Sequence, residues 1–186
     1  NMSQDASVFL DSFSNVTTPA TLRLHRADGR QLQALVPNTL DDTHPWAPYL
    51  PDQAPTQFGT LKAVDGQLLH YSITRPKVLE PGKRYPVIVD VYGGPGVQNV
   101  VNAWAGTWEN FHQVLARDGY IVFSLDNRGT GDRGVRFESA LHMRLGSVEV
   151  DDQKAGVEFL RTLPEVDPQR IGIMGWSYGG YMALMC

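Results

Sequence analysis

Apolar runs and amphipathic stretches alternate through the second half of the chain, and this alternation constrains the fold most. Residues 87–92, 120–125 and 171–174 are nearly continuous apolar runs, as expected for buried strands. Between these runs, residues 108–117 and 148–163 show the spacing of apolar residues that is typical of amphipathic helices. Such alternation is typical of a mostly parallel sheet with helices on both faces. The sequence therefore predicts an α/β fold.

The N-terminal part follows a different pattern. Residues 8–10 and two alternating runs within 20–36, around Asp28 and Gly29, predict a small antiparallel β meander. Prolines then recur through residues 37–55, a composition that sustains neither a β ladder nor a helix. We interpret this stretch as a crossing between two modules.

A second hairpin is expected before the alternating part. Its strands lie at residues 58–64 and 68–73, and Asp65 and Gly66 form the turn. The second module therefore begins near this hairpin.

The sequence Gly-Trp-Ser-Tyr-Gly occupies residues 175–179, between the strand expected at 171–174 and a helix-forming run at 181–185. Glycines flanking such a turn avoid Cβ clashes while the serine sits strained and exposed at its tip. Gly180 is expected to let the helix pack closely on the strand. A purely structural glycine turn is the alternative, but the strand before and the helix after favour Ser177 as a nucleophile.

Acyl transfer at a serine also needs hydrogen-bond donors for the oxyanion. The backbone N–H of Tyr178, directly after the nucleophile, is one expected donor. Residues 92–96, Tyr-Gly-Gly-Pro-Gly, leave the end of an earlier strand, where the active-site loops of open parallel sheets gather. The phenol of Tyr92 is the second candidate donor, and a structural tyrosine in a glycine-rich turn remains the alternative.

Two polar segments invite other interpretations. Residues 126–132 resemble a phosphate loop, but they lack the Lys-Ser/Thr pair and the dinucleotide glycine spacing. We expect a structural loop with Asp126 and Arg128 paired locally. The acidic cluster of Glu149, Asp151 and Asp152 lies at the start of a predicted helix, where negative charge is favourable, so capping is expected rather than metal binding.

Composition excludes several partner classes. The net charge is −4 and the Lys and Arg residues are scattered, which argues against nucleic acid. No apolar run approaches the roughly 20 residues of a membrane span, so soluble material is expected. Cys186 is the only cysteine, and the five histidines lack ligand spacing. No metal or organic cofactor is expected, and a periplasmic, secreted or cytoplasmic location stays open.

Four stretches together resemble the prolyl oligopeptidase family of serine peptidases, and most closely its dipeptidyl peptidases. They are Asp-Val-Tyr-Gly-Gly-Pro (90–95), Asp-Asn-Arg-Gly-Thr-Gly (126–131), Arg-Leu-Gly-Ser-Val-Glu-Val-Asp-Asp-Gln (144–153) and Gly-Trp-Ser-Tyr-Gly-Gly-Tyr (175–181). By this resemblance, residues 57–186 are the N-terminal half of an α/β-hydrolase domain. Residues 1–36 resemble the end of a capping β-propeller, and residues 37–56 resemble the interdomain crossing.

The resemblance also implies an activity. Ser177 would attack the carbonyl after a proline or alanine at the second position of a peptide, so that an N-terminal dipeptide is released. Tyr92 and Tyr178 would donate to the oxyanion, and the side chains of Tyr178 and Trp176 would contact the substrate. The implied partners are a peptide substrate, the rest of the hydrolase domain with its propeller, and a second subunit in a full-length homodimer.

One feature departs from the family pattern. In an α/β-hydrolase an Asp and then a His follow the nucleophile, but residues 178–186 contain neither. We therefore expect this chain alone to be nearly inert and of doubtful stability, as a segment of a longer enzyme or one completed by another chain. Two alternatives remain: a catalytically silent structural or binding relative, and an acylaminoacyl or tripeptidyl peptidase of the same family.

Overall fold

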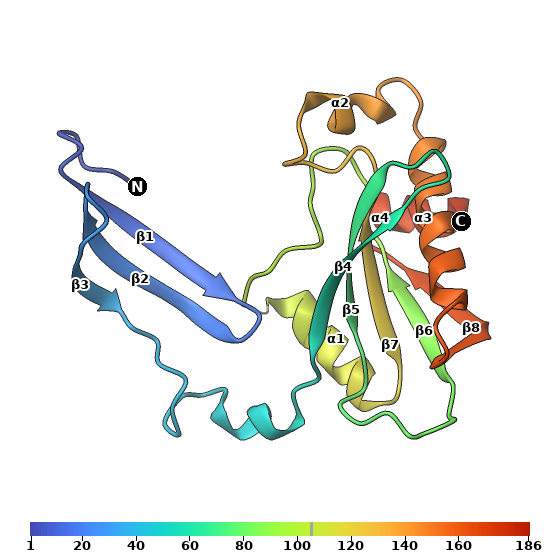
Figure 1. Ribbon diagram of the computed structural model, residues 1–186, viewed down its shortest axis with the longest axis horizontal. Coiled ribbons are helices and arrows are strands. Elements are labelled where there is room, and N and C mark those ends of the chain that lie inside the picture. Colours follow the sequence, from blue (N-terminus) through green and yellow to red (C-terminus); the bar gives the residue numbers. More distant parts are fainter. Residues whose placement is uncertain (105) are drawn as a thin grey trace. The chain divides into compact units, whose positions relative to one another are not determined.

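The computed structural model describes residues 1–104 and 106–186, without the side chains of residues 107 and 108. The chain divides into two compact units (Figure 1). One comprises Asn1–Gln53 and Asn102–Glu109, and the other comprises Ala54–Val101 and Asn110–Cys186. All the candidate site residues fall in the second unit.

The first unit contains the antiparallel meander that the sequence predicts. Gly29 has a φ of 87°, and the backbone N–H of Arg30 donates to Oδ1 of Asp28 at 2.9 Å, which closes the expected turn. The last strand is exposed along its whole length. The strands lie in the order β1 (Val8–Asn15), β2 (Thr18–Arg26) and β3 (Gln31–Val36). That they are the end of a propeller stays a prediction.

The proline-rich stretch is not free of helix, which corrects the expectation. Residues Ala47–Asp52 form a short 3₁₀ helix, with a proline in its first turn and Pro51 inside it. A 3₁₀ turn is too short to suffer the full loss of hydrogen bonds that proline causes in a long α-helix. Trp46 packs against Tyr49, with ring centroids 5.4 Å apart, and so helps to hold this turn.

The sheet of the second unit is mixed rather than mostly parallel. β6 pairs in parallel with both β7 and β8, whereas the β4–β5 and β5–β7 pairs are antiparallel. The hairpin about Gly66 reverses the chain at one edge and adds the antiparallel strands. The order is β4 (Thr56–Lys62), β5 (Leu68–Thr74), β7 (Ile121–Asp126), β6 (Tyr85–Asp90) and β8 (Val166–Met174).

Helices lie on both faces of this sheet (Figure 1). Phe159 of α3 packs on Tyr71 and Phe123, on the face that contains most of the apolar core. His112 of α1 contacts Asp90, whose side chain points to the opposite face from Val89 because strand side chains alternate. The helices are α1 (Thr107–Arg117), α3 (Val148–Arg161) and α4 (Tyr178–Met185).

The sequence does not predict a short helical segment that lies between β7 and α3. It comprises α2 (Val135–Glu138) and a 3₁₀ turn, Ser139–Leu141. Phe137 and Leu141 are its buried residues, and a Cβ on Gly129 would overlap the Leu141 side chain. Tertiary packing therefore holds a segment too short for a periodic signal.

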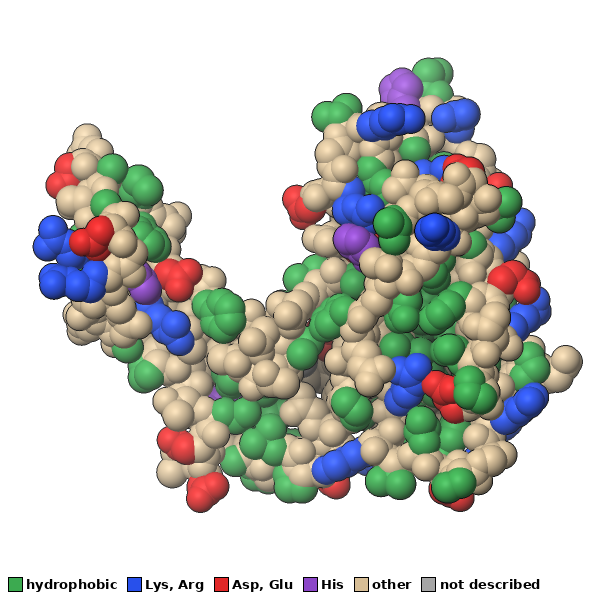
Figure 2. Space-filling model, in the orientation of Figure 1, with side chains coloured by type: hydrophobic (Ala, Val, Ile, Leu, Met, Phe, Trp, Pro, Cys, Tyr) green, Lys and Arg blue, Asp and Glu red, His purple; other side chains and the backbone are tan. Residues whose placement is uncertain are grey.

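The surface mixes charges of both signs. On the face shown in Figure 2, Lys and Arg side chains are interspersed with Asp and Glu. In the part of the chain that the structure describes, no helix combines the length and apolarity required to cross a bilayer.

Candidate active site

Ser177 occupies the tip of the sharp turn between β8 and α4. Its backbone has φ 58° and ψ −118°, a strained combination for a residue other than glycine. The residue is exposed, and as the N-cap of α4 its side chain makes no capping hydrogen bond. The predicted strand, strained serine and helix are all present, so the local geometry is that of a nucleophile elbow.

Two glycines allow the elbow to approach the sheet. A Cβ on either Gly175 or Gly179 would overlap the backbone carbonyl oxygen of Val91. At Gly180 the nearest atom to a Cβ would be the carbonyl oxygen of Gly175, at an ordinary 3.6 Å. The role predicted for Gly180 is therefore wrong, because Gly179 makes the close approach.

The loop after β6 brings Tyr92 to the elbow. The rings of Tyr92 and Tyr178 have centroids 6.4 Å apart, and Gly94 lies against both. A Cβ on Gly94 would stand 2.8 Å from Cε1 of Tyr92 and 2.9 Å from Cγ of Tyr178, so no larger residue fits there without displacing a ring. The structure thus places the two tyrosines predicted as oxyanion donors side by side, although they are 86 residues apart in the sequence.

The two side chains predicted to contact substrate differ in their surroundings. The ring of Tyr178 is half-buried, and it also packs edge-on against Tyr181, with centroids 5.2 Å apart. Trp176 is 75% exposed, and in the described residues no aromatic ring packs against it. Tyr178 is therefore preorganised, whereas Trp176 is available at the surface beside Ser177.

Glu149 makes a contact with the site that the sequence does not suggest. It is completely buried, and its Oε1 accepts a hydrogen bond from the hydroxyl of Tyr178 at 2.9 Å. Burial, followed by this hydrogen bond and the charge of Glu149, raises the pKa of Tyr178 above its ordinary value. The capping predicted for this acidic segment takes another form: both oxygens of Glu149 accept backbone N–H groups just before α3, and the N-cap residue Ser147 makes no side-chain capping hydrogen bond.

The loop at residues 126–132 supports the Tyr92 loop. Nδ2 of Asn127 donates to the carbonyl oxygen of Gly93 at 3.0 Å. Nε2 of Gln153, on α3, donates in turn to Oδ1 of Asn127 at 2.8 Å, and both side chains are buried. These bonds bear out the structural role expected for the loop.

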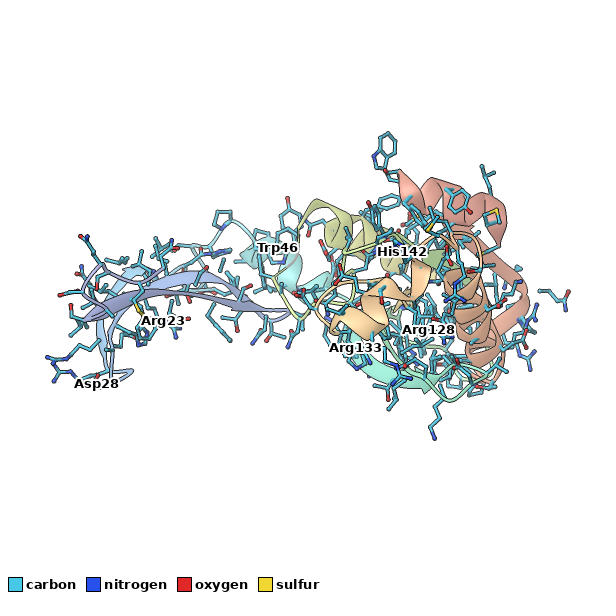
Figure 3. All side chains as sticks on the ribbon, turned by 90° about the horizontal axis from the view of Figure 1, so that it is seen from above. Arg23, Asp28, Trp46, Arg128, Arg133 and His142 are labelled. Atoms are coloured by element: carbon cyan, nitrogen blue, oxygen red, sulfur yellow. The ribbon has the colours of Figure 1, made fainter. Side chains whose placement is uncertain are left out.

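The pairing expected within that loop is wrong. Arg128, which is labelled in Figure 3, forms three hydrogen bonds with the buried carboxylate of Asp152, two from its guanidinium at 2.6 and 3.0 Å and one from its backbone N–H at 2.9 Å. Its guanidinium forms one further hydrogen bond, with Asp65, at 2.5 Å. Asp126 instead accepts the backbone N–H groups of residues 99 and 100. Burial raises the pKa of Asp126, although those two N–H groups act in the opposite direction.

Known proteins resemble this chain both in sequence and in structure. The family model described as the prolyl oligopeptidase family matches residues 108–186. Dipeptidyl peptidase 8 of Homo sapiens is 35% identical over 191 residues, which cover 99% of this chain and 21% of that protein. The crystal structure of Porphyromonas gingivalis dipeptidyl peptidase 4 matches with a TM-score of 0.87 at 34% identity, over 98% of this chain and 25% of that chain.

Residues 108–186 belong to the prolyl oligopeptidase family. A candidate dipeptidyl aminopeptidase IV from Bacteroides ovatus also matches, with a TM-score of 0.87 and 38% identity, over 98% of this chain and 25% of that one. The chain thus spans about a fifth of the human relative, 21%, and a quarter of each solved chain. The region matched to the family model contains Ser177 and Tyr178, and Tyr92 precedes it.

In the second unit, one histidine pairs closely with a carboxylate. Nε2 of His112 lies 2.6 Å from Oδ2 of Asp90. Val91 packs against Met182 of α4. The side chain of Asp90 points to the opposite face of the sheet, because neighbouring strand residues alternate. The pair is therefore a satisfied polar contact on the other face. Across residues 1–104 and 106–186, no group of three or more His, Cys, Asp or Glu side chains is arranged to hold a metal ion.

Proposed function

We propose that Ser177 is the nucleophile of a serine exopeptidase that releases N-terminal dipeptides with proline or alanine second. The elbow carries this proposal, because Ser177 is exposed, strained and unengaged by its own helix. The first N–H groups of a helix lack intrahelical partners, so the N–H of Tyr178 at the start of α4 is free to bind an oxyanion. Relatives named dipeptidyl peptidases support the substrate class.

In the proposed reaction, Oγ of Ser177 attacks the carbonyl carbon after the second residue and passes its proton to a histidine. That histidine and its aspartate lie outside these 186 residues. The N–H of Tyr178 and the O–H of Tyr92 donate to the oxyanion, and the C–N bond breaks as the histidine protonates the leaving amine. Water then hydrolyses the ester on Ser177 and frees the dipeptide.

A catalytically silent relative is the second candidate. One observation favours it: His112 is held by Asp90, on the other face of the sheet. Without a base, the Ser177 hydroxyl is a weak nucleophile, and the elbow would serve only to pack α4 on the sheet.

Labelling with a fluorophosphonate separates the two candidates. We expect the full-length enzyme to gain one phosphonyl group at Ser177, seen by intact-mass analysis and peptide mapping. Ser177→Ala is expected to remove the label and to lower kcat by about 10⁶-fold. A well-folded enzyme that stays unlabelled would support the silent relative.

Substrate choice needs a matched pair of peptides. We expect cleavage after Gly-Pro and Ala-Pro when the amino group is free, and loss of cleavage when the same peptides are N-acetylated. Preference for the acetylated peptides would instead indicate an acylaminoacyl peptidase.

A further inference from the structure

Glu149 is a buried carboxylate whose partners are all neutral donors. It is 0% exposed. Its Oε1 accepts the N–H of Gly146 at 2.5 Å and the hydroxyl of Tyr178 at 2.9 Å, and Oε2 accepts the N–H of Ser147 at 3.0 Å. In the described residues, no cation forms an ion pair with it. A buried charge of this kind persists only where its donors are held in place.

The hydrogen bond to Glu149 fixes the far end of the Tyr178 side chain. Gly94 lies against the near end of the same ring, and the rings of Tyr92 and Tyr181 pack beside it. A tyrosine has two side-chain torsions, so a ring held at its hydroxyl and along its face leaves the Cα and the backbone N–H little freedom. These contacts therefore fix the orientation of the Tyr178 backbone N–H, which follows Ser177 directly in the chain.

The segment before α3 is itself locked to the helix after the elbow. A Cβ on Gly146 would overlap the hydroxyl of Tyr181 and stand 3.0 Å from Cε of Met185. Glu149 therefore joins two packed elements, the start of α3 and the start of α4. Through its carboxylate, the segment before α3 is hydrogen-bonded to Tyr178, a residue of the candidate oxyanion site.

We propose that Glu149 is a positioning residue of the active site, which holds the Tyr178 hydroxyl so that the adjacent N–H and ring keep the orientation that the transition state requires. This inference rests on the proposed function, because it assigns Glu149 a part in the reaction at Ser177. A residue that fixes geometry from outside the reacting atoms acts on kcat more than on KM.

The test uses the full-length enzyme and three variants at this contact: Glu149→Gln, Tyr178→Phe and the double variant. Glu158→Gln is the matched control, because Glu158 lies exposed on the same helix and its one ion pair within the described residues is with Arg161. The readouts are kcat and KM on a Gly-Pro substrate, the rate of fluorophosphonate labelling, and thermal unfolding.

We expect kcat to fall by about 10- to 100-fold in each single variant, with KM nearly unchanged and labelling slowed in parallel. The double variant should be no slower than the slower single variant, because both act on the same contact: Tyr178→Phe removes the donor, and Glu149→Gln replaces the charged acceptor with a neutral amide. Glu158→Gln should match wild type. Tyr178→Phe keeps the packed ring, so it carries the test if Glu149→Gln does not fold.

Unchanged kcat in folded variants, or independent effects that multiply in the double variant, would overturn the proposal while wild-type labelling leaves the proposed function standing. An unlabelled wild-type enzyme would overturn the proposed function, and this inference with it.

Discussion

The carbonyl oxygen of Val91 decides which residues the elbow tolerates. Gly175 and Gly179 both lie so close to this oxygen that a Cβ on either residue would overlap it. Because the obstacle is backbone, it cannot rotate away as a side chain would. We expect Gly179→Ala to destabilise the protein by about 3 kcal/mol, measured by urea unfolding, and to abolish labelling of Ser177.

Gly180→Ala is the matched control for that prediction. Its new methyl group would meet nothing closer than 3.6 Å, and alanine is favoured over glycine in a helix by about 1 kcal/mol. Labelling and stability should therefore be retained. An equal loss in both variants would show that helix packing in general, and not contact with Val91, limits the elbow.

Among the elements, α3 organises the site through a buried polar face. Asp152 on this face is completely buried and holds Arg128, whose only other carboxylate partner in the described residues is the exposed Asp65. We expect Asp152→Asn to lower the free energy of unfolding by about 3 kcal/mol, because it leaves a largely buried guanidinium without its main counter-charge. Urea unfolding of the variant against wild type gives the measurement.

Asp151→Asn is the corresponding control on α3. The Asp151 side chain is 71% exposed, and it pairs with Lys154 at 3.6 Å across one helical turn. The unfolding midpoint of this control should stay close to that of wild type, since exposed pairs contribute little. Similar midpoints for the two variants would contradict the structural role given to Asp152.

At the scale of the whole molecule, the two units differ in how their strands are protected. β7 is buried at every position and lies between β5 and β6, whereas β3 is exposed throughout and lies at the edge of its sheet, beside β2. Amide hydrogen exchange followed by mass spectrometry should therefore find the amides of β7 slower than those of β3 by orders of magnitude. Comparable rates in the two strands would mean that the second unit opens as readily as an edge strand.

Most strands and long helices could be predicted from the sequence, because their signals are local. Apolar runs and helical spacing located β6, β7, α1 and α3 to within a few residues. The elbow was also predictable, since its glycines, serine and flanking elements adjoin in the chain. The roles of Ser177, Tyr92, Tyr178 and Trp176 in catalysis stay predictions.

By itself, then, the sequence determined the α/β character, the nucleophile elbow and the family, all of which depend on residues close together in the chain. Only the tertiary structure decided that the sheet is mixed, that α2 forms, that Arg128 pairs with Asp152, and that Glu149 meets Tyr178. The last two contacts join residues 24 and 29 positions apart. No local pattern encodes such pairs, because their partners are chosen by how the whole chain packs.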